Sequence, residues 1–260
     1  MTENKRITIL AAVLAAVMLC ACLLPALIPF AQKIIDNSSE NFGGSTAGSP
    51  RAVALREGDY VRFGVYRGEP LLWQVIQFDQ NGRPLLIADE VICFKAFDVP
   101  TDAAVYGSSD WDDCSLKRWL NSAESLVEDY GEKGFLSADH FTAAERESIA
   151  ESGVFLPAKN DLKNAQSLSL KKRCQTGAAD STDFLILPKQ SVWYWTQTPN
   201  GSSRASVVCV TSSGGFYKTL ASDKNTGVCP ALFLRSSAVT AVGDGTKTAP
   251  YLFAEGGEQR

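Results

Sequence analysis

Residues 58–78 read GDYVRFGVYRGEPLLWQVIQF and indicate how the folded part of the chain begins. Val61, Phe63 and Val65 alternate with polar or small residues, a period of two that places every second side chain on one face of a strand. Residues 67–70 have the composition of a turn, and a second apolar run follows them. We therefore expect an antiparallel pair of strands joined by a tight turn.

Strand signals continue on both sides of a polar middle section. Asn81 and Gly82 both tolerate the positive φ of a tight turn, so they predict a second hairpin connection. Further strands are predicted at residues 84–88, 91–94, 184–187, 192–196, 206–211, 216–218 and 228–234.

Two short helices are expected between these groups of strands. The apolar spacing within residues 115–121 predicts the first helix, with Asp113 or Ser115 as its N-cap. A capping box begins the second helix, over residues 142–149. Residues 155–182 are polar and rich in lysine, which is typical of a solvated loop. Strands at both ends with helices between them predict an α+β fold with antiparallel sheets.

Composition narrows the classes of function. The chain has 260 residues, 45% hydrophobic and 21% charged, with a formal net charge of -4, which is typical of a globular protein and supplies no basic field for nucleic acid. His140 is the single histidine, so a His-rich zinc site is excluded. We expect His140, which follows Asp139, to be a surface loop residue. No cofactor motif is present in the sequence.

The N-terminal segment predicts a membrane anchor. Residues 7–30 contain no charged side chain, and as a helix they would reach about 36 Å, against about 30 Å for the hydrocarbon core of a bilayer. Lys5 and Arg6 precede this segment, and positive charge beside a first hydrophobic helix tends to stay cytoplasmic. We expect a cytoplasmic tail at residues 1–6 and an extracellular C-terminal domain on a single-pass cell-membrane protein.

Two other fates of this segment compete with the anchor. It could be a cleaved signal peptide, or a lipoprotein signal with Cys20 or Cys22 as the lipidated residue. Apolar residues follow Cys22, whereas a lipidated cysteine normally precedes a polar linker, and Pro29 disfavours cleavage near the end of the segment. The uncleaved anchor is favoured, and the polar residues 31–56 are then a flexible stalk.

Several motifs resemble a bacterial domain-of-unknown-function family, the one numbered six-two-seven-three. They occur in the same order as in the family and span residues 57–235, most of the predicted ectodomain. The matching pieces are residues 58–64 (GDYVRFG), 69–76 (EPLLWQVI), 115–121 (SLKRWLN), 141–149 (FTAAERESI), 193–199 (WYWTQTP) and 227–232 (GVCPAL).

This resemblance implies an extracellular module similar to C-type-lectin-like folds, in which a terminal strand pair closes a compact α+β domain. It implies no established reaction. Two residues depart from the family pattern: Gln197 stands where an arginine follows the tryptophans, and Cys229 stands where an arginine precedes Pro-Ala-Leu. Whatever those arginines do in the family, this chain does otherwise.

The predicted ectodomain contains an odd number of cysteines in a compartment that permits disulfides. We expect bridges between Cys209 and Cys229 and between Cys93 and Cys114, which leaves Cys174 unpaired. The alternative is that these cysteines are buried, reduced thiols.

Aromatic residues offer the best ligand site in the sequence. Flat rings beside carboxylates and amides suit a sugar, whose faces stack while its hydroxyls need acceptors. The predicted ligand-binding residues are Tyr106, Asp110, Trp111, Asp112, Trp193, Trp195, Gln197 and Asn200. Alternate residues of a strand point to opposite faces, so at least one of the tryptophans is expected to be core. Trp73 and Trp119 lie in apolar patterns and are also expected in the core.

Two rival interpretations use other residues. Asp110, Asp112 and Asp113 could offer oxygens to calcium, but helix capping and solvation explain an Asp-rich helix start more simply, so no metal site is predicted. Relatives by fold include sulfatase-activating enzymes that use paired cysteines, and Cys209 with Cys229 could imitate that pair. A cysteine-dependent enzyme and a purely structural surface protein are therefore the alternatives to a recognition module.

The C-terminal residues complete the prediction. Residues 243–253 (GDGTKTAPYLF) resemble an element found at the edge of such bacterial surface domains, so residues 236–260 should add an edge strand and a tail. The sequence thus predicts a membrane-anchored, non-catalytic recognition module for a glycan or a surface protein, with no cofactor and no nucleic-acid partner.

Overall fold

The computed structural model describes residues 53–164, 173–174, 179, 191–235 and 242–253. All of them belong to one compact unit, Pro50–Arg260. The predicted anchor, most of the stalk and the strand predicted at residues 184–187 lie outside the described residues. No helix within the described ranges has the length and apolar character that a membrane crossing requires.

The expected α+β class is confirmed, since the described chain consists mostly of strands in sheets with a few short helices. A six-stranded sheet has the order β13-β1-β2-β3-β12-β5. Its strands are β1 (Tyr60–Tyr66), β2 (Glu69–Phe78), β3 (Pro84–Ala88), β5 (Ile149–Phe155), β12 (Ala231–Leu234) and β13 (Tyr251–Leu252).

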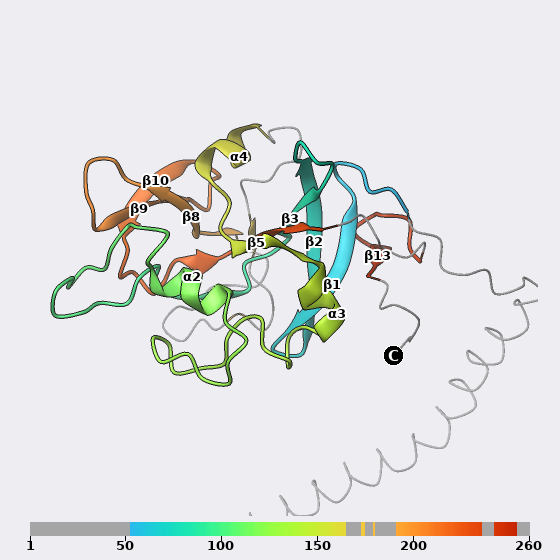
Figure 1. Ribbon diagram of the computed structural model, residues 1–260. Helices are drawn as coiled ribbons and strands as arrows, with labels where there is room; N and C mark the ends of the chain where they lie inside the picture. The colour runs from blue at the N-terminus through green and yellow to red at the C-terminus, as the bar shows by residue number, and fades with distance from the viewer. Residues whose placement is uncertain (1–52, 165–172, 175–178, 180–190, 236–241, 254–260) are drawn as a thin grey trace, which may run out of the picture. The chain divides into compact units, whose positions relative to one another are not determined.

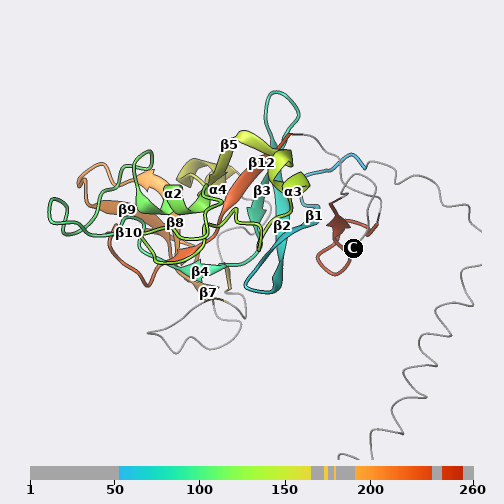
Figure 2. The same cartoon turned by 60° about the horizontal axis from the view of Figure 1, so that its bottom comes forward.

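A second, five-stranded sheet has the order β10-β9-β8-β11-β4. Its strands are β4 (Cys93–Phe94), β8 (Tyr194–Pro199), β9 (Ser206–Val210), β10 (Phe216–Leu220) and β11 (Gly227–Val228), and a separate pair joins β6 (Arg173–Cys174) to β7 (Ser191–Val192). Strands β1 to β3 and strands β8 to β10 lie at opposite ends of the domain (Figures 1 and 2).

Helix capping follows the sequence only in part. The predicted capping box starts α3 (Ala143–Ser148), where Thr142 accepts from the Glu145 backbone and Glu145 accepts from the Thr142 backbone. Helix α2 (Ser115–Leu120) is capped by Cys114 instead of the predicted Asp113 or Ser115, because the Cys114 Sγ accepts from the Lys117 backbone N–H at 3.4 Å. A thiol is a weak acceptor, so sequence rules for caps do not favour it.

The second predicted helix forms, but two elements of the middle section, β5 and α4 (Lys159–Asn164), were not predicted. The second predicted helix ends before Ile149, where strand β5 begins and pairs with β12. Residues 155–182, predicted as a solvated loop, include helix α4, which begins where the Asp161 carboxylate accepts from the Ala158 N–H at 2.9 Å. Pairing partners distant in sequence and one buried side chain, Leu162, stabilise these elements beyond their local propensity.

Pairing is antiparallel with two exceptions among the described strands. Strand β13 pairs with β1 in parallel, with Val61 opposite Tyr251, and β11 pairs with β8 in parallel. The edge strand expected from the C-terminal glycine-rich element is confirmed as β13. Strand β11 continues through Cys229 and Pro230 into β12, so the chain passes there from one sheet to the other.

One hydrophobic core joins both sheets. The indoles of Trp73 and Trp119 have no exposed surface, as predicted, and their N–H groups donate to the carbonyl oxygens of Phe63 at 2.7 Å and of Lys133 at 2.9 Å. Each buried indole thus satisfies its polar atom while its ring fills the core.

Candidate binding pocket and aromatic surface

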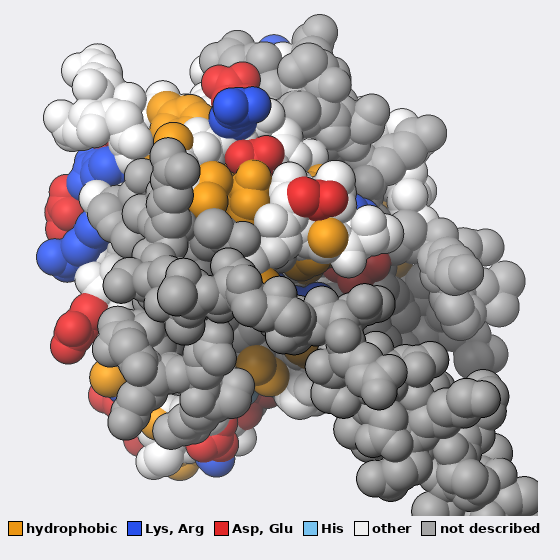
Figure 3. Space-filling view, turned by 90° about the vertical axis from the view of Figure 1, so that its right-hand side faces the viewer, with side chains coloured by type: hydrophobic (Ala, Val, Ile, Leu, Met, Phe, Trp, Pro, Cys, Tyr) orange, Lys and Arg blue, Asp and Glu red, His pale blue; other side chains and the backbone are white. Residues whose placement is uncertain are grey.

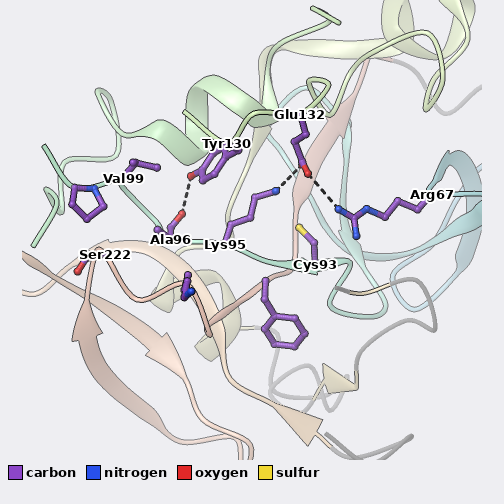
Figure 4. Close-up of a pocket in the computed structure, with 11 residues that line it drawn as sticks. Arg67, Cys93, Lys95, Ala96, Val99, Tyr130, Glu132 and Ser222 are labelled. Carbon is purple, nitrogen blue, oxygen red and sulfur yellow. Dashed lines mark hydrogen bonds and ion pairs between the residues drawn. The ribbon is translucent and has the colours of Figure 1, made fainter. Parts of the chain in front are cut away.

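A pocket of about 430 Å³ lies where segments distant in sequence meet (Figure 4). The β1–β2 turn, strand β4 with the residues that follow it, the 130–132 turn and the loop after β10 supply its walls. The lining residues are Arg67, Cys93, Phe94, Lys95, Ala96, Val99, Pro100, Tyr130, Glu132, Ser222 and Lys224.

The β1–β2 turn places Arg67 at the pocket. Arg67 and Gly68 both have positive φ, 49° and 83°, and Tyr66 pairs with Glu69, which is the pattern of a two-residue type I′ hairpin turn. Arg67 is the one residue other than glycine with positive φ among those described, although Asn or Gly would adopt this conformation more readily. Its guanidinium contacts the Glu132 carboxylate at 3.3 Å and lies over the Tyr66 ring.

Lys95 carries a charge into the protein interior. Its side chain is 8% exposed, and its ammonium group lies 2.6 Å from the Glu132 Oε1. The same ammonium lies 4.7 Å from the centre of the Trp119 ring and 4.8 Å from that of Tyr130. A buried cation requires such partners, because burial removes its hydration.

The segment that carries Tyr130 and Glu132 is held in place. The Val127 N–H donates to the Glu132 carbonyl at 2.7 Å, and Asp129 forms an ion pair with Arg118 of α2 at 2.9 Å. The Tyr130 hydroxyl donates to the carbonyl of Ala96 at 2.8 Å. The Glu132 carboxylate is therefore fixed between Lys95 and Arg67, as Figure 4 shows.

Cys93 contributes a buried thiol to the pocket wall. Burial raises the pKa of Cys93 to about 11, while the Lys95 ammonium and a hydrogen bond from the Tyr66 hydroxyl act in the opposite direction. Burial also raises the pKa of Tyr66, so this hydroxyl stays protonated. Cys93 is thus a neutral thiol at physiological pH and a poor nucleophile.

Charged side chains contribute to the pocket lining. Among the described lining residues three are basic, Arg67, Lys95 and Lys224, and one is acidic, Glu132. On the side of the domain that carries β1 and β13, by contrast, the described acidic and basic side chains are interspersed (Figure 3). The chain as a whole has a formal net charge of -4.

The aromatic residues predicted from sequence fall into three environments. Tyr106 and Trp193 are exposed at the surface. Trp111 is half-buried and packs on Phe97 with ring centroids 5.8 Å apart. Trp195 has no exposed surface, so its place in the predicted ligand set is corrected: it packs on Phe97 and donates its indole N–H to the carbonyl of Lys95 at 2.8 Å. The expectation that at least one tryptophan belongs to the core is confirmed.

The polar members of the predicted set lie in loops. The Ser109 N–H donates to the carbonyl of Arg204, which joins the loop of Asp110 to the turn that begins at Asn200. Asp110 is exposed and accepts from the Asp112 N–H, and Asp112 forms an exposed ion pair with Lys117 at 2.6 Å.

Two further predicted residues, Trp193 and Gln197, lie beside or on strand β8 of the five-stranded sheet. Gln197 is half-buried on β8, and its N–H donates to the carbonyl of Pro157. Trp193 packs on Tyr217 of β10 with ring centroids 5.7 Å apart. The structure therefore brings the loops of Asp110 and Asn200 together and gives Trp193 an aromatic neighbour that the sequence did not identify.

Tyr106 is linked to the pocket. The Ser222 N–H donates to the Tyr106 carbonyl at 3.1 Å, and Ser222 lines the pocket. The loop that carries Tyr106 begins with Val99 and Pro100, which form another part of the pocket wall. The sequence missed Arg67, Lys95 and Glu132, although a lysine inside the apolar run VICFKAF (residues 91–97) is a signal that could have identified one of them.

The two predicted disulfides are not formed, because Cys93, Cys114, Cys209 and Cys229 are buried thiols. Strand β8 lies between β9, which holds Cys209, and β11, which precedes Cys229. Two strand spacings are about 9.5 Å, beyond the Cα separation of about 7 Å that a disulfide allows. Cys229 donates its Sγ–H to the carbonyl of Ala88 at 3.2 Å. The side chain of Cys174 lies outside the described residues.

His140 is half-buried, which corrects the expectation of a surface loop residue. Its Nδ1 lies 3.0 Å from the carbonyl oxygen of Phe135, and its ring packs 4.9 Å from that of Tyr66. Within the described ranges, no cluster of three potential metal-ligating side chains occurs.

The buried thiols predict that stability falls at high pH. Burial raises the pKa of Cys93 to about 11 and the pKa values of Cys114 and Cys209 to about 12, from an ordinary value of about 9. Between pH 9 and 11 the unfolded chain loses these protons and the folded chain keeps them. The contribution of these thiols to the free energy of unfolding is therefore fully present below pH 9. As the pH rises above 9, the free energy of unfolding should fall by up to about 1.4 kcal/mol per pH unit for each thiol.

Urea unfolding at pH 8 and pH 10.5 measures this effect. Cys93→Ser should reduce the difference in the free energy of unfolding between the two pH values. A thiol reagent added to the folded chain at pH 8 should react slowly with the described cysteines. Equal midpoints at both pH values, or rapid reaction of all the described thiols at pH 8, would contradict the assignment.

Residues 154–236 match the family model described as Domain of unknown function (DUF6273). The predicted resemblance to this family is therefore confirmed over residues 154–236, a shorter range than the predicted residues 57–235. The chain has no significant match among curated proteins or solved structures.

Proposed function

With residues 154–236 matching that family, we propose that the chain is a membrane-anchored recognition module whose extracellular domain binds its ligand in the pocket around Lys95. In this proposal residues 7–30 anchor the protein and the domain has a C-type-lectin-like fold. The uncharged N-terminal run supports the anchor, and the pairing of β13 with β1, which joins the two ends of the domain, supports the fold.

The observation that carries the proposal is the combination of a roomy pocket with fixed polar groups. A pocket of about 430 Å³ lies within the range typical of small-ligand sites, which are mostly apolar with a few placed polar groups. Phe94, Val99 and Pro100 supply apolar walls, while Lys95 and Glu132 are held by ion pairing and by the ordered turn. Binding to such a site requires little reorganisation of the protein.

The thiols of the described cysteines are buried and protonated, which favours a binding function over cysteine-dependent catalysis. An enzyme of that kind needs a thiolate, and burial raises the pKa of Cys93, Cys114 and Cys209 to about 11 or 12. Cys209 and Cys229 are further separated by strand β8.

An array of glycans and peptides, probed with the labelled full-length chain in detergent, tests the proposal. We expect capture of a restricted set of ligands, reduced about tenfold or more by Arg67→Gly. This substitution removes the guanidinium from the pocket and suits the positive φ at that position, so the fold should remain stable. Arg56→Gly, at an exposed arginine outside the pocket lining, is the control and should bind as the unmodified chain does. Capture of nothing, or capture unaffected by Arg67→Gly, would contradict recognition in this pocket.

A further inference from the structure

We infer that Asn200 is a site of spontaneous deamidation, at which the chain converts its own side-chain amide to a carboxylate. The sequence contains two asparagines that precede glycine, Asn81 and Asn200. Both lie at connections between neighbouring strands, the first between β2 and β3 and the second between β8 and β9. The structure distinguishes them, because the attacking nitrogen is free in one turn and hydrogen-bonded in the other. The reaction needs only the chain and water, so it does not depend on the proposed ligand pocket.

The reaction is an attack of a backbone nitrogen on the preceding side chain. The Gly201 nitrogen loses its proton to a base in solvent and bonds to the Asn200 Cγ, while the bond from Cγ to the amide nitrogen breaks and ammonia leaves with a proton. The product is a cyclic succinimide. Water then opens the ring at either carbonyl, which leaves aspartate or isoaspartate at this position. Overall, an amide and water give a carboxylic acid and ammonia. A following glycine favours the attack, because it has no Cβ to hinder it.

The turn between β8 and β9 leaves the attacking nitrogen free. None of the described residues accepts a hydrogen bond from the Gly201 N–H, and no atom lies within 4 Å of a Cβ placed on this glycine. Within the described part of the chain, the peptide unit between Asn200 and Gly201 is held by one hydrogen bond, from the Ser203 N–H to the Asn200 carbonyl at 3.0 Å. This unit can therefore rotate toward the Asn200 side chain when a single bond at the surface opens.

The Ser202 hydroxyl favours the attack. It donates to the Asn200 Oδ1 at 3.2 Å, and negative charge develops on this oxygen when the nitrogen adds to Cγ. Hydrogen bonds to a charged oxygen are stronger than those to a neutral one, so the hydroxyl stabilises the tetrahedral intermediate more than the starting amide. Three consecutive residues therefore supply the electrophile, the nucleophile and a donor for the developing charge.

The turn between β2 and β3 holds the corresponding groups in place. The Gly82 N–H donates to the carbonyl of Asp79 at 3.0 Å, so the nitrogen that would attack is already hydrogen-bonded. The Asp79 carboxylate accepts from the backbone N–H groups of Asn81 at 2.9 Å and of Arg83 at 2.8 Å. An ion pair with the Arg83 guanidinium fixes this carboxylate in turn. Because ring closure at Asn81 must disturb several hydrogen bonds, two of them to a charged group, it should be slower there.

Conversion changes the charge of a surface that the sequence analysis assigned to ligand binding. A carboxylate in place of the Asn200 amide adds one negative charge to the turn. The Ser109 N–H donates to the Arg204 carbonyl at 2.7 Å and joins this turn to the loop of Asp110, which already carries a carboxylate. The charge of this surface therefore changes with the age of each protein molecule.

Incubation of the full-length chain in detergent, in heavy-oxygen water at mildly alkaline pH, tests this inference. Digestion and peptide mass spectrometry follow, and the heavy oxygen marks those residues that converted before digestion. In the folded chain we expect conversion at Asn200 to be at least about tenfold faster than at Asn81. After unfolding in urea the two rates should become similar, because both asparagines precede glycine.

Three variants test the causes separately. Gly201→Ala should slow conversion at Asn200 about tenfold, and the fold should tolerate it because the methyl group enters open space. Ser202→Ala should slow conversion at Asn200 severalfold. Asp79→Ala removes the carboxylate that holds the other turn, so it should speed conversion at Asn81 and leave the rate at Asn200 unchanged.

Equal rates at the two asparagines in the folded chain, or faster conversion at Asn81, would overturn the inference. The absence of conversion at Asn200 over a period in which the unfolded chain converts would do the same. An unchanged rate at Asn81 in Asp79→Ala would show that the hydrogen bonds of the Asp79 carboxylate do not set the difference between the two turns.

Discussion

Replacement of Trp195 by alanine should lower the free energy of unfolding by about 3–5 kcal/mol. The indole has no exposed surface, packs 5.7 Å from the Phe97 ring, and donates to the carbonyl of Lys95. Truncation would leave a cavity between β8 and the segment after β4, and it would also leave the Lys95 carbonyl without its donor. Urea unfolding followed by circular dichroism measures the loss.

Trp193→Ala is the matched variant on the same stretch of chain. Trp193 is 38% exposed and packs on Tyr217 at the surface, so we expect its truncation to cost less than about 1 kcal/mol. Similar stability losses for both variants would show that the assignment of one tryptophan to the core and the other to the surface is wrong. Ligand capture by Trp193→Ala, measured on the array, tests whether this predicted contact residue takes part in binding.

Gly64→Ala should destabilise the domain by about 2–5 kcal/mol, from overpacking and backbone strain together. Gly64 has φ of +71°, and a Cβ placed there would lie 2.3 Å from the Cε1 of Phe141. The Phe141 ring cannot move aside, because Phe63 and Phe135 pack against it with centroids 5.5 and 5.2 Å away. The Gly64 N–H also donates to the Glu145 carboxylate at 2.7 Å, so a shift of the backbone would disturb the start of α3.

Gly82→Ala separates the two causes of this loss. Gly82 has nearly the same φ, +72°, but no atom lies within 4 Å of a Cβ placed there. We expect the backbone strain alone, about 1–2 kcal/mol. Thermal or urea unfolding of both variants gives the difference, which reports the contact with Phe141. Equal losses would mean that the core around Phe141 accommodates a methyl group.

The sequence predicted those parts of the fold that local signals specify. Strand β3 matches the predicted residues 84–88, the capping box of α3 forms as expected, and Trp73 and Trp119 occupy the core. Period-two alternation, capping motifs and apolar spacing act over a few residues, so one sequence suffices to detect them.

Features that depend on distant partners were missed. Strand β5 forms because β12, about eighty residues later, pairs with it. The disulfide pairing was wrong because the sequence does not show that β8 separates β9 from β11. Cysteine counting considers only the compartment and the spacing along the chain, whereas bridging requires two Cα atoms within about 7 Å.

The candidate site shows the same limit. Tyr106 was predicted as a ligand-binding residue because it is an aromatic residue near carboxylates in the sequence, and the structure links its backbone to the pocket through Ser222. Trp195 was predicted by the same reasoning, but it is buried. The charged residues Arg67, Lys95 and Glu132 come from three separate segments, and only the folded chain brings them together. A single lysine in an apolar run indicates an unusual environment without identifying its partner.

The position of β1 has a mechanical consequence. This strand is the first after the predicted stalk, and it lies between β2 and β13, so it has paired neighbours on both sides. Inter-strand hydrogen bonds run roughly perpendicular to the strands. Tension applied through the N-terminal end of β1 and directed along its axis would therefore load several of these bonds together in shear, whereas tension on the short strand β13 would peel its two residue pairs from the edge one after the other. Under tension at both ends the domain should therefore yield first at β13, and β1, the first strand after the predicted stalk, should be the last strand of that edge to separate.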